Sequence, residues 1–496
     1  MNKKTDERED RLKKLALLKE KNINPYPAKA SRDFTIAEIL AKFESLKDKQ
    51  FSLVGRLRSV REHGNLIFAD LQDASGKIQL AISKQNLGDE KYKLFLKTID
   101  NGDFIEVAGK TFVTHKGQNS IEVYDYKILT KSLRPIPVEH FGLQDEEEKL
   151  RKRYLDILLN PELKEMINKK ALFWNSMREF LQKKGFIEVE TPVLETTTGG
   201  ADARPFVTHH NALDIDVYLR ISGGELWQKK LMVAGMEKTF EIGRIFRNEG
   251  ISAEHAQDYT QMEFYWAYAN YEDGMKLVKK MYQQVAKKTF NTLKFKIGEH
   301  EVDLGGKWEK YDYVKIIKKI TGINVLKTDA NLTEAKHSDG LEKIEKKLQE
   351  LNIKYDKNGF NLTRAIDNLW KYCRKSISGP GFLINVPVTM EPLAKRDEKN
   401  PETVQRFQVI LAGSEMGKGY SELNDPLDQA ERFSEQQKLR DAGDDEAQMN
   451  DDSFVEALEY GMPPTCGFGV SERLFSFLMN KPLRECQTFP LLRPKN

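Results

Sequence analysis

Cysteine is scarce in this sequence, with only Cys373, Cys466 and Cys486 among 496 residues. Three such distant residues exclude a disulfide framework and a four-cysteine zinc site, and they suit a reducing compartment. No apolar run approaches the ~20 residues that a membrane helix requires. Asp6 and Glu7 give the N-terminus acidic charge, unlike a secretory or mitochondrial signal. We therefore expect a cytoplasmic protein with no membrane partner.

The chain also lacks an excess of either charge. It has 79 lysines and arginines against 76 acidic residues, a formal net charge of +3. Overall charge thus gives no argument for or against binding nucleic acid, although a basic patch could be local. Hydrophobic residues make up 39%, which is enough for large packed cores. The length predicts two to four domains, at roughly 100–200 residues per domain.

The first third of the chain changes character at residue 51. Residues 1–50 predict a helical arm, with Leu12, Leu15 and Leu18 at helical spacing and Pro25 ending the helix. Residues 51–132 predict five strands separated by turn signals, which favours a small barrel of the OB-fold type. These strands are expected at 51–57, 66–71, 78–83, 104–113 and 121–129. The prolines and the acidic run of residues 133–160 indicate a linker.

From residue 161 to the end, helical and strand patterns alternate in what we expect to be one α+β domain. A long helix is predicted over 161–184, and Gly185 is its expected stop. Its apolar stripe is Leu163, Ile167, Leu172, Trp174, Met177 and Leu181. Residues 328–378 are lysine-rich and helical in pattern, and they lack clusters of chemistry-bearing residues. We interpret them as a helical insertion within this domain.

Three ordered segments of this region carry recognisable motifs. They are Lys184–Pro192 (KGFIEVETP), Phe246–Tyr265 with its FRNE start, and Gly467–Arg473 (GFGVSER). They resemble motifs 1, 2 and 3 of class II aminoacyl-tRNA synthetases. Residues 208–214, 218–221 and 421–425 resemble bacterial lysyl-tRNA synthetases more narrowly. The resemblance covers nearly the whole chain and is weakest in 328–378; it implies an antiparallel catalytic sheet flanked by helices, behind an anticodon-binding barrel.

The resemblance implies a lysine–tRNA ligase. In that family ATP activates L-lysine to lysyl-adenylate with release of pyrophosphate, and the lysyl group then passes to the 3′-terminal adenosine of tRNA(Lys). The implied cofactor is Mg²⁺, and the implied partners are ATP, L-lysine, tRNA(Lys) and a second copy of the chain, with motif 1 at the dimer interface. No protein nucleophile is needed, because positioning and charge neutralisation dominate this displacement chemistry.

The resemblance also implies roles for individual residues. Arg247 and Arg473 match the catalytic arginines of motifs 2 and 3. The expected lysine-binding residues are Gly200, Glu225, Arg247, Glu263, Tyr265, Lys418, Tyr420 and Glu422. The expected ATP-binding residues are Arg247, Glu249, His255, Tyr259, Glu415, Gly467, Gly469 and Arg473. Glu415 and Gln408 occupy the metal-ligand positions, and Arg58, Arg61, Phe68 and Gln79 the anticodon-binding positions.

Five positions depart from the family pattern. Gln408 stands where a second metal-binding glutamate is usual, and Glu254 where an arginine often touches the γ-phosphate. Ala256 replaces an asparagine next to His255, and Lys418 replaces an asparagine of the pocket. Ser471 replaces a glycine of motif 3. These changes gather at the phosphate end of the site, so the number of metal ions and the ATP geometry stay open. Lys418 could supply the positive charge of the missing arginine.

Two alternative functions stay open at this stage. An aspartyl- or asparaginyl-tRNA synthetase would share the architecture, but Glu225 and Glu422 argue against an anionic substrate. A non-catalytic RNA-binding paralogue would explain the departures around ATP. The presence of Arg247, Glu415 and Arg473 argues against it.

Overall fold

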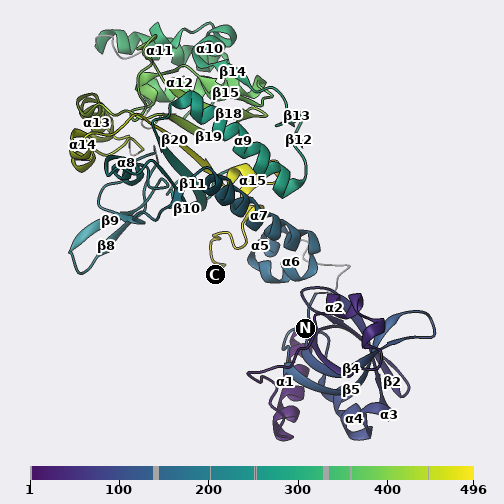
Figure 1. Cartoon of the computed structure of the whole chain (residues 1–496). Helices are drawn as coiled ribbons and strands as arrows, with labels where there is room; N and C mark the ends of the chain where they lie inside the picture. The colour runs from purple at the N-terminus through teal and green to yellow at the C-terminus, as the bar shows by residue number, and fades with distance from the viewer. Residues whose placement is uncertain are drawn as a thin grey trace. The chain divides into compact units, whose positions relative to one another are not determined.

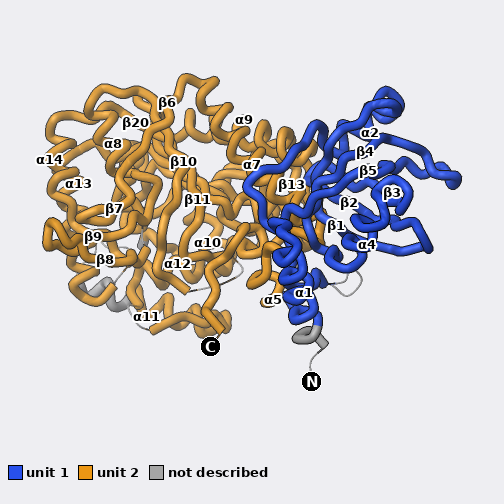
Figure 2. The backbone as a smooth tube through the Cα atoms, turned by 90° about the horizontal axis from the view of Figure 1, so that it is seen from below, with its two compact units in different colours: residues 1–146 blue, residues 147–496 orange. Residues whose placement is uncertain are grey.

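The chain forms two compact units, residues 1–146 and 147–496 (Figure 2). The computed structural model describes residues 3–137, 145–201, 203–250, 252, 254–327, 334–357, 360–444 and 446–495. Each unit has its own apolar core, and each is described below by itself. Across those described ranges, every helix is too short or too polar to cross a bilayer.

The first unit is built on a closed five-stranded barrel (Figure 1). Its strands are β1 Phe51–His63, β2 Leu66–Gln72, β3 Lys77–Ser83, β4 Phe104–Val113 and β5 Asn119–Thr130. The order around the barrel is β1-β2-β3-β5-β4, and only β3 and β5 pair in parallel. Alternate residues such as Leu53, Leu80 and Ile105 fill the interior. The predicted strands and the predicted barrel are confirmed.

Several α-helices accompany the barrel. They are α1 Lys3–Glu20, α2 Ile36–Ala41, α3 Lys84–Leu87 and α4 Asp89–Thr98. The helix α1 is anchored at Arg11, whose guanidinium donates to the carbonyls of Asn101 and Ser132, each at 3.1 Å. Thr35 and Glu38 form a reciprocal capping box at the start of α2. The helical arm therefore packs on the barrel rather than extending from it.

The second unit is organised around an eight-stranded sheet of order β14-β15-β18-β19-β20-β11-β10-β6. Only the outermost pairs, β14·β15 and β10·β6, are parallel. The strands are β6 Ile187–Glu188, β10 Lys238–Phe246, β11 Asp258–Ala267, β14 Glu309–Asp312, β15 Gly381–Ile384, β18 Arg406–Leu411, β19 Ser414–Ser421 and β20 Thr465–Ser471. Smaller sheets contain β7 Leu194–Glu195, β8 Val207–His210, β9 Ile215–Leu219, β12 Lys294–Ile297, β13 His300–Asp303, β16 Val386–Pro387 and β17 Thr403–Val404. The expected sheet, largely antiparallel and flanked by helices, is confirmed.

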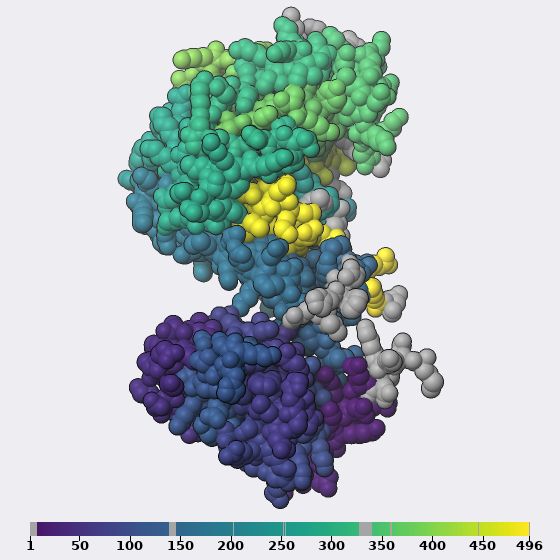
Figure 3. Space-filling view, turned by 90° about the vertical axis from the view of Figure 1, so that its right-hand side faces the viewer, coloured from purple at the N-terminus to yellow at the C-terminus, as the bar shows by residue number. Residues whose placement is uncertain are grey.

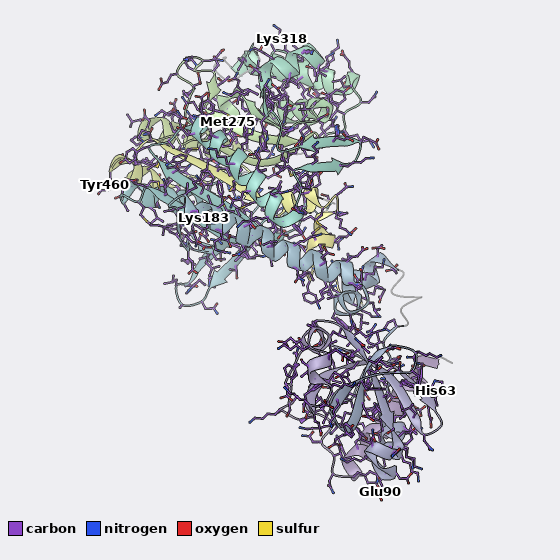
Figure 4. The ribbon with its side chains drawn as sticks, turned by 45° about the vertical axis from the view of Figure 1, so that its right-hand side comes forward. His63, Glu90, Lys183, Met275, Lys318 and Tyr460 are labelled. Carbon is purple, nitrogen blue, oxygen red and sulfur yellow. The ribbon has the colours of Figure 1, made fainter. Side chains whose placement is uncertain are left out.

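Helices cover this sheet. The longest are α7 Pro161–Lys183 and α9 Tyr271–Phe290, which pack together with β10, β11 and β20 in one core; Figure 4 labels Lys183 on α7 and Met275 on α9. The others are α5 Glu146–Arg151, α6 Arg153–Leu159, α8 Glu225–Val233, α10 Tyr313–Thr321, α11 Glu334–Glu350, α12 Leu362–Cys373, α13 Pro426–Asp441, α14 Asp452–Glu459 and α15 Arg473–Leu478. In Figure 3 the yellow C-terminal residues are packed against earlier segments of this unit. There Phe475 of α15 contacts the rings of Phe173 and Phe290.

Two segments, the predicted linker and the predicted helical insertion, both contain helices. The segment 133–160 contains the helices α5 and α6 in its second half, while residues 138–144 lie outside the described part of the chain. The segment 328–378 contains α11 and α12, which bury Ile344, Leu348 and Trp370 in the second core of this unit. Residues 328–333 and 358–359 also lie outside the described part. The proposed domain boundaries stay predictions.

Candidate active site

A cavity of about 470 Å³ opens where β11, β18, β19 and β20 meet the start of α8. Every site residue that the sequence suggested for the second unit lines it. They are Gly200, Glu225, Arg247, Glu249, His255, Tyr259, Glu263, Tyr265, Gln408, Glu415, Lys418, Tyr420, Glu422, Gly467, Gly469 and Arg473. The second and third motifs thus meet at one cavity, although their residues come from distant parts of the sequence, whereas residues 184–192 of the first motif do not line it.

One end of the cavity is acidic and buried. Glu225 is the first residue of α8, Glu263 lies on β11, and Glu422 directly follows β19; each is at most 5% exposed. A Cβ at Gly467 would come within 2.1 Å of Glu422 Oε1, so only glycine fits beneath that carboxylate. Three carboxylates in so little space can stay ionised only if cations accompany them.

Glu263 is the most completely hydrogen-bonded of the three carboxylates. It accepts from the Gly223 backbone at 2.7 Å, from Gln261 Nε2 at 2.6 Å and from the Tyr265 hydroxyl at 3.1 Å. Burial and the neighbouring Glu225 nevertheless raise the pKa of Glu263 to about 7. Burial also raises the pKa of Glu422 well above its ordinary value. Both shifts share one cause, the burial of neighbouring carboxylates, and a positive charge brought among them would lower each pKa again.

The other end of the cavity is rich in basic residues. Those that line it are Arg247, Arg364, Lys371, Arg406, Lys418 and Arg473. Five of them have an acidic partner: Arg364 pairs with Asp444, Lys371 with Asp367, Arg406 and Lys418 with Glu391, and Arg473 with Glu254. Arg247 alone has no carboxylate partner among the described residues. It is therefore the cation best prepared to receive an anionic ligand.

Arg247 lies one residue beyond β10, and its backbone is fixed by the N–H that it donates to Gln257 O at 2.7 Å. Its Nε donates to the Ile221 carbonyl at 3.3 Å. The guanidinium carbon is 5.9 Å from the centre of the Tyr259 ring. These contacts use one of its nitrogens and leave its fork for an anion.

Arg473 is already paired. Its guanidinium forms an ion pair with Glu254, one of the residues that departs from the family pattern. Its second amino group reaches the Glu415 carbonyl at 3.5 Å. Burial lowers the pKa of Arg473, which makes a charged partner more valuable. Glu254 is thus paired with a guanidinium group that would bind phosphate in an ATP site.

The metal-ligand positions lie on β18 and β19. The Trp370 indole donates to Glu415 Oε1 at 2.6 Å. Burial would raise the pKa of Glu415, but Arg374 and this hydrogen bond outweigh it and lower the pKa. Gln408 lies directly across from Lys418 on the neighbouring strand, and its amide oxygen accepts from Arg406. In the described ranges, no group of three or more His, Cys, Asp or Glu residues could hold a metal by itself.

Sequence reasoning missed several residues at this cavity. Lys229 forms ion pairs with Glu225 and Glu422 behind the acidic end. The segment 328–378 was expected to lack chemistry, but α12 brings Arg364, Lys371 and Trp370 to the cavity or its carboxylates. The spacing of Glu225 and Lys229, four residues apart on a helix, was the available signal for that pair. Nothing local in the sequence indicated the contribution of α12.

In the first unit, the suggested anticodon-binding residues lie on the barrel strands β1 to β3. Arg61 on β1 is directly opposite Phe68 on β2, so these two side chains share one face of the sheet. Phe68 is half-buried, and its ring centre is 6.1 Å from that of His63, which Figure 4 labels. Gln79 is buried and accepts from the Ser120 hydroxyl at 2.9 Å. Arg58 also belongs to β1, next to a bulge.

Known proteins resemble this chain over nearly its full length. A family model described as class II tRNA synthetases (D, K and N) matches residues 145–493, and one for the OB-fold nucleic-acid-binding domain matches residues 51–129. Lysine–tRNA ligase of Thermotoga maritima is 41% identical, over 98% of this chain and 96% of its own length. The chain belongs to the lysine–tRNA ligase family. The Moorella thermoacetica member is 42% identical over 98% of this chain and 97% of its own.

Membership of this family gives the cavity a context. The class II family match spans the whole eight-stranded sheet, and the match to the OB-fold model coincides with the barrel. The roles of individual residues are not tested by these similarities and stay predictions.

Proposed function

We propose that the protein is a lysine–tRNA ligase, which activates L-lysine with ATP and transfers it to the 3′-terminal adenosine of tRNA(Lys). The observation that carries this proposal is the convergence of three buried glutamates and one unpaired arginine on a single cavity. A substrate with two ammonium groups and one carboxylate matches that arrangement in the sign of its charges, with the ammonium groups at the glutamates and the carboxylate at the arginine.

The acidic end would bind lysine. Glu225 and Glu263 would hold the α-ammonium group, with Gly200 presenting its backbone, while Glu422 and Tyr265 would hold the ε-ammonium group. Tyr420 supports this set, since its hydroxyl donates to Glu225. An uncharged or acidic side chain would leave a buried carboxylate unpaired, and that penalty is the basis of selection.

Arg247 would join the two substrates. Its guanidinium fork can hold the lysine carboxylate and an α-phosphate oxygen together. A carboxylate oxygen then attacks the α-phosphorus, the bond to the β-phosphate oxygen breaks, and pyrophosphate leaves. Arg473 would stabilise the terminal phosphates, and Tyr259, Glu249 and His255 would contact the nucleotide. Gly467 and Gly469, where a side chain would meet neighbouring atoms, would let β20 approach the ligand closely.

Magnesium fits this site only together with substrate phosphates. Glu415 offers one carboxylate, and Mg²⁺ is commonly held by one or two carboxylates and the phosphates of its nucleotide. The Gln408 oxygen is already engaged by Arg406 and is the weaker candidate ligand. When bound, the ion would withdraw charge from the departing pyrophosphate. Lys418 faces Glu391 at 3.2 Å, and its action on a phosphate is part of the proposal.

The barrel would bind the anticodon. Phe68 would stack on a base, Gln79 would contact a base edge, and Arg58 and Arg61 would hold phosphates, which is how single-stranded RNA is commonly bound. We also propose that the enzyme is a homodimer with residues 184–192 at the interface. Its cytoplasmic location is part of the same proposal, which the three unpaired cysteines support.

Amino-acid-dependent pyrophosphate exchange tests this function. We expect exchange with L-lysine, little with aspartate or asparagine, and charging of tRNA(Lys) by the same preparation. Exchange with aspartate or asparagine in place of lysine would reassign the substrate. Binding of tRNA without exchange for any amino acid would show a non-catalytic paralogue.

A further inference from the structure

A fully buried ammonium group lies directly behind the acidic end of the cavity. Lys229, on the second turn of α8, is completely enclosed. Its Nζ is 2.7 Å from Glu225 Oε1 and 2.5 Å from Glu422 Oε2. The rings of Tyr420 and Phe454 flank the ammonium group, with centres at 5.5 and 5.7 Å. Lys229 does not itself line the cavity.

The partners of Lys229 explain how a buried lysine stays charged here. Burial lowers the pKa of an ammonium group, but the carboxylates of Glu225 and Glu422 outweigh it, and the pKa of Lys229 is raised. The ammonium group in turn opposes the mutual repulsion of the carboxylates. Removing one member of such a buried group leaves uncompensated charge.

Each carboxylate gives Lys229 only one of its two oxygens. Glu225 uses Oε1, which also accepts from the Tyr420 hydroxyl, and Glu422 uses Oε2. The other oxygens, Glu225 Oε2 and Glu422 Oε1, have no ion-pair partner within the described ranges. Glu422 Oε1 lies over Gly467, which lines the cavity. Each carboxylate therefore has one oxygen paired with Lys229 and a second oxygen that remains for a ligand.

We infer that Lys229 is a positioning residue for recognition of the lysine substrate: it aims Glu225 and Glu422 at the two ammonium groups without touching them. The inference rests on the proposed function of the cavity and adds a residue to it. An ion pair that served stability alone would have no need of these two carboxylates, which are placed to meet the substrate at both of its ammonium groups.

The charges around the ammonium group predict a pH signature. Glu225 faces Lys229 from α8 itself, and Glu422 and Tyr420 face it from the β19 side, while α14 contributes the uncharged Phe454. On β11, Glu263 and Tyr265 neighbour Glu225 instead. Without the ammonium group, nothing behind the acidic end would oppose the repulsion between the carboxylates, and Glu422 would hold a proton more tightly. Substrate lysine would then have to displace that proton, at a cost that falls as the pH rises.

Lysine-dependent pyrophosphate exchange by the full chain and its Lys229→Met variant tests the inference. We expect the KM for lysine to rise about 100-fold near pH 7.5. The ratio of the variant's KM for lysine to that of the parent enzyme should fall at least about threefold between pH 6.5 and 8.5. The variant's KM for ATP should stay within about twofold of the parent value. Lys230→Met is the matched control, because Lys230 is the next residue of α8 and bonds to Ser453 instead; its KM values should not change.

A lysine KM within about threefold of the parent value would overturn the inference, as would a rise independent of pH. Should Lys229→Met fail to fold, Lys229→Arg keeps the charge but changes its geometry. The KM of that variant for lysine should then rise at least about fivefold with the ATP KM unchanged, and no rise, or equal rises in both, would overturn the inference. Failure of the parent chain to exchange with lysine would instead overturn the proposed function.

Discussion

Glu254 is a single side chain with a large expected effect on nucleotide binding. Its carboxylate forms an ion pair with the Arg473 guanidinium, and in doing so it competes with the terminal phosphates of ATP for that group. Glu254→Ala should therefore lower the KM for ATP by about three- to tenfold, the scale of one partly exposed ion pair. Titrating ATP in the exchange assay measures this.

The control for Glu254 is Glu179→Ala, which breaks an ion pair with Lys288 between α7 and α9. That variant should leave the KM for ATP unchanged. A higher KM in Glu254→Ala would mean that the carboxylate assists ATP, for example through the loop that contains it.

Glu263 predicts how lysine recognition depends on pH. Its pKa is raised to about 7, and only the ionised form pairs with an ammonium group. Lysine and a proton therefore compete, so the KM for lysine should fall as pH rises through 7, by up to about tenfold per unit below that point. The KM for ATP should change less over the same range, and a flat profile for lysine would contradict the assignment of Glu263.

Lys229 is a residue whose contacts the sequence alone did not predict. Glu263 and Glu422 belong to recognisable stretches, and the resemblance to the family pointed to Glu225. The ion pair between Lys229 and Glu422 depends on packing α8 against the end of β19, and no local pattern reports that packing. Contacts between distant segments are the part of the site that required the structure.

The helix α12 supplies a hydrogen bond to the proposed metal ligand. The Trp370 indole donates to Glu415 and helps to lower the pKa of that carboxylate. Trp370→Phe removes the donor while keeping an aromatic ring, and should raise the Mg²⁺ concentration for half-maximal exchange by about three- to tenfold. Magnesium titrations would measure it.

Trp308→Phe is the matched control for Trp370, because it removes another buried indole donor, here to the Leu304 carbonyl. It should leave the Mg²⁺ requirement unchanged. Equal shifts in both variants would mean that Trp370 acts only through general stability.

The end of α7 depends on one glycine. Gly185 has φ of +81°, and only Lys238 Nζ lies near its would-be side chain, at 4.0 Å. Gly185→Ala should therefore cost about 1 kcal/mol of unfolding free energy through backbone strain alone. Thermal or denaturant unfolding would measure this, and Gly185→Asn should lose less, since asparagine tolerates this conformation. Equal losses would contradict the explanation.

The same helix shows how well periodicity predicts an element. The expected range of 161–184 agrees with α7 at Pro161–Lys183, and Leu163, Met177 and Leu181 are buried as expected. Leu172 was placed on the apolar stripe but is 41% exposed, so that assignment was wrong. Periodicity locates a stripe to within a residue or so, and the neighbours decide which residues at its margin are covered.

At the scale of the whole molecule, the two units predict separable functions. Phe68→Ala in the barrel should raise the KM for tRNA in aminoacylation by about 10- to 100-fold, which is the loss of binding expected when one base no longer stacks on an aromatic ring. Lysine-dependent pyrophosphate exchange should be unchanged, because the cavity belongs wholly to the other unit.

Val113→Ala changes an exposed apolar side chain elsewhere on the barrel, on β4, and is the control for the half-buried Phe68. It should leave both assays unchanged. A loss of exchange in Phe68→Ala would show that the barrel influences activation and is not restricted to RNA.

The crowding of three carboxylic acids at one end of the cavity has a physiological consequence. In a mildly acidified cell Glu263, whose pKa is raised to about 7, would take up a hydrogen ion, and the enzyme would then hold a cationic substrate less well.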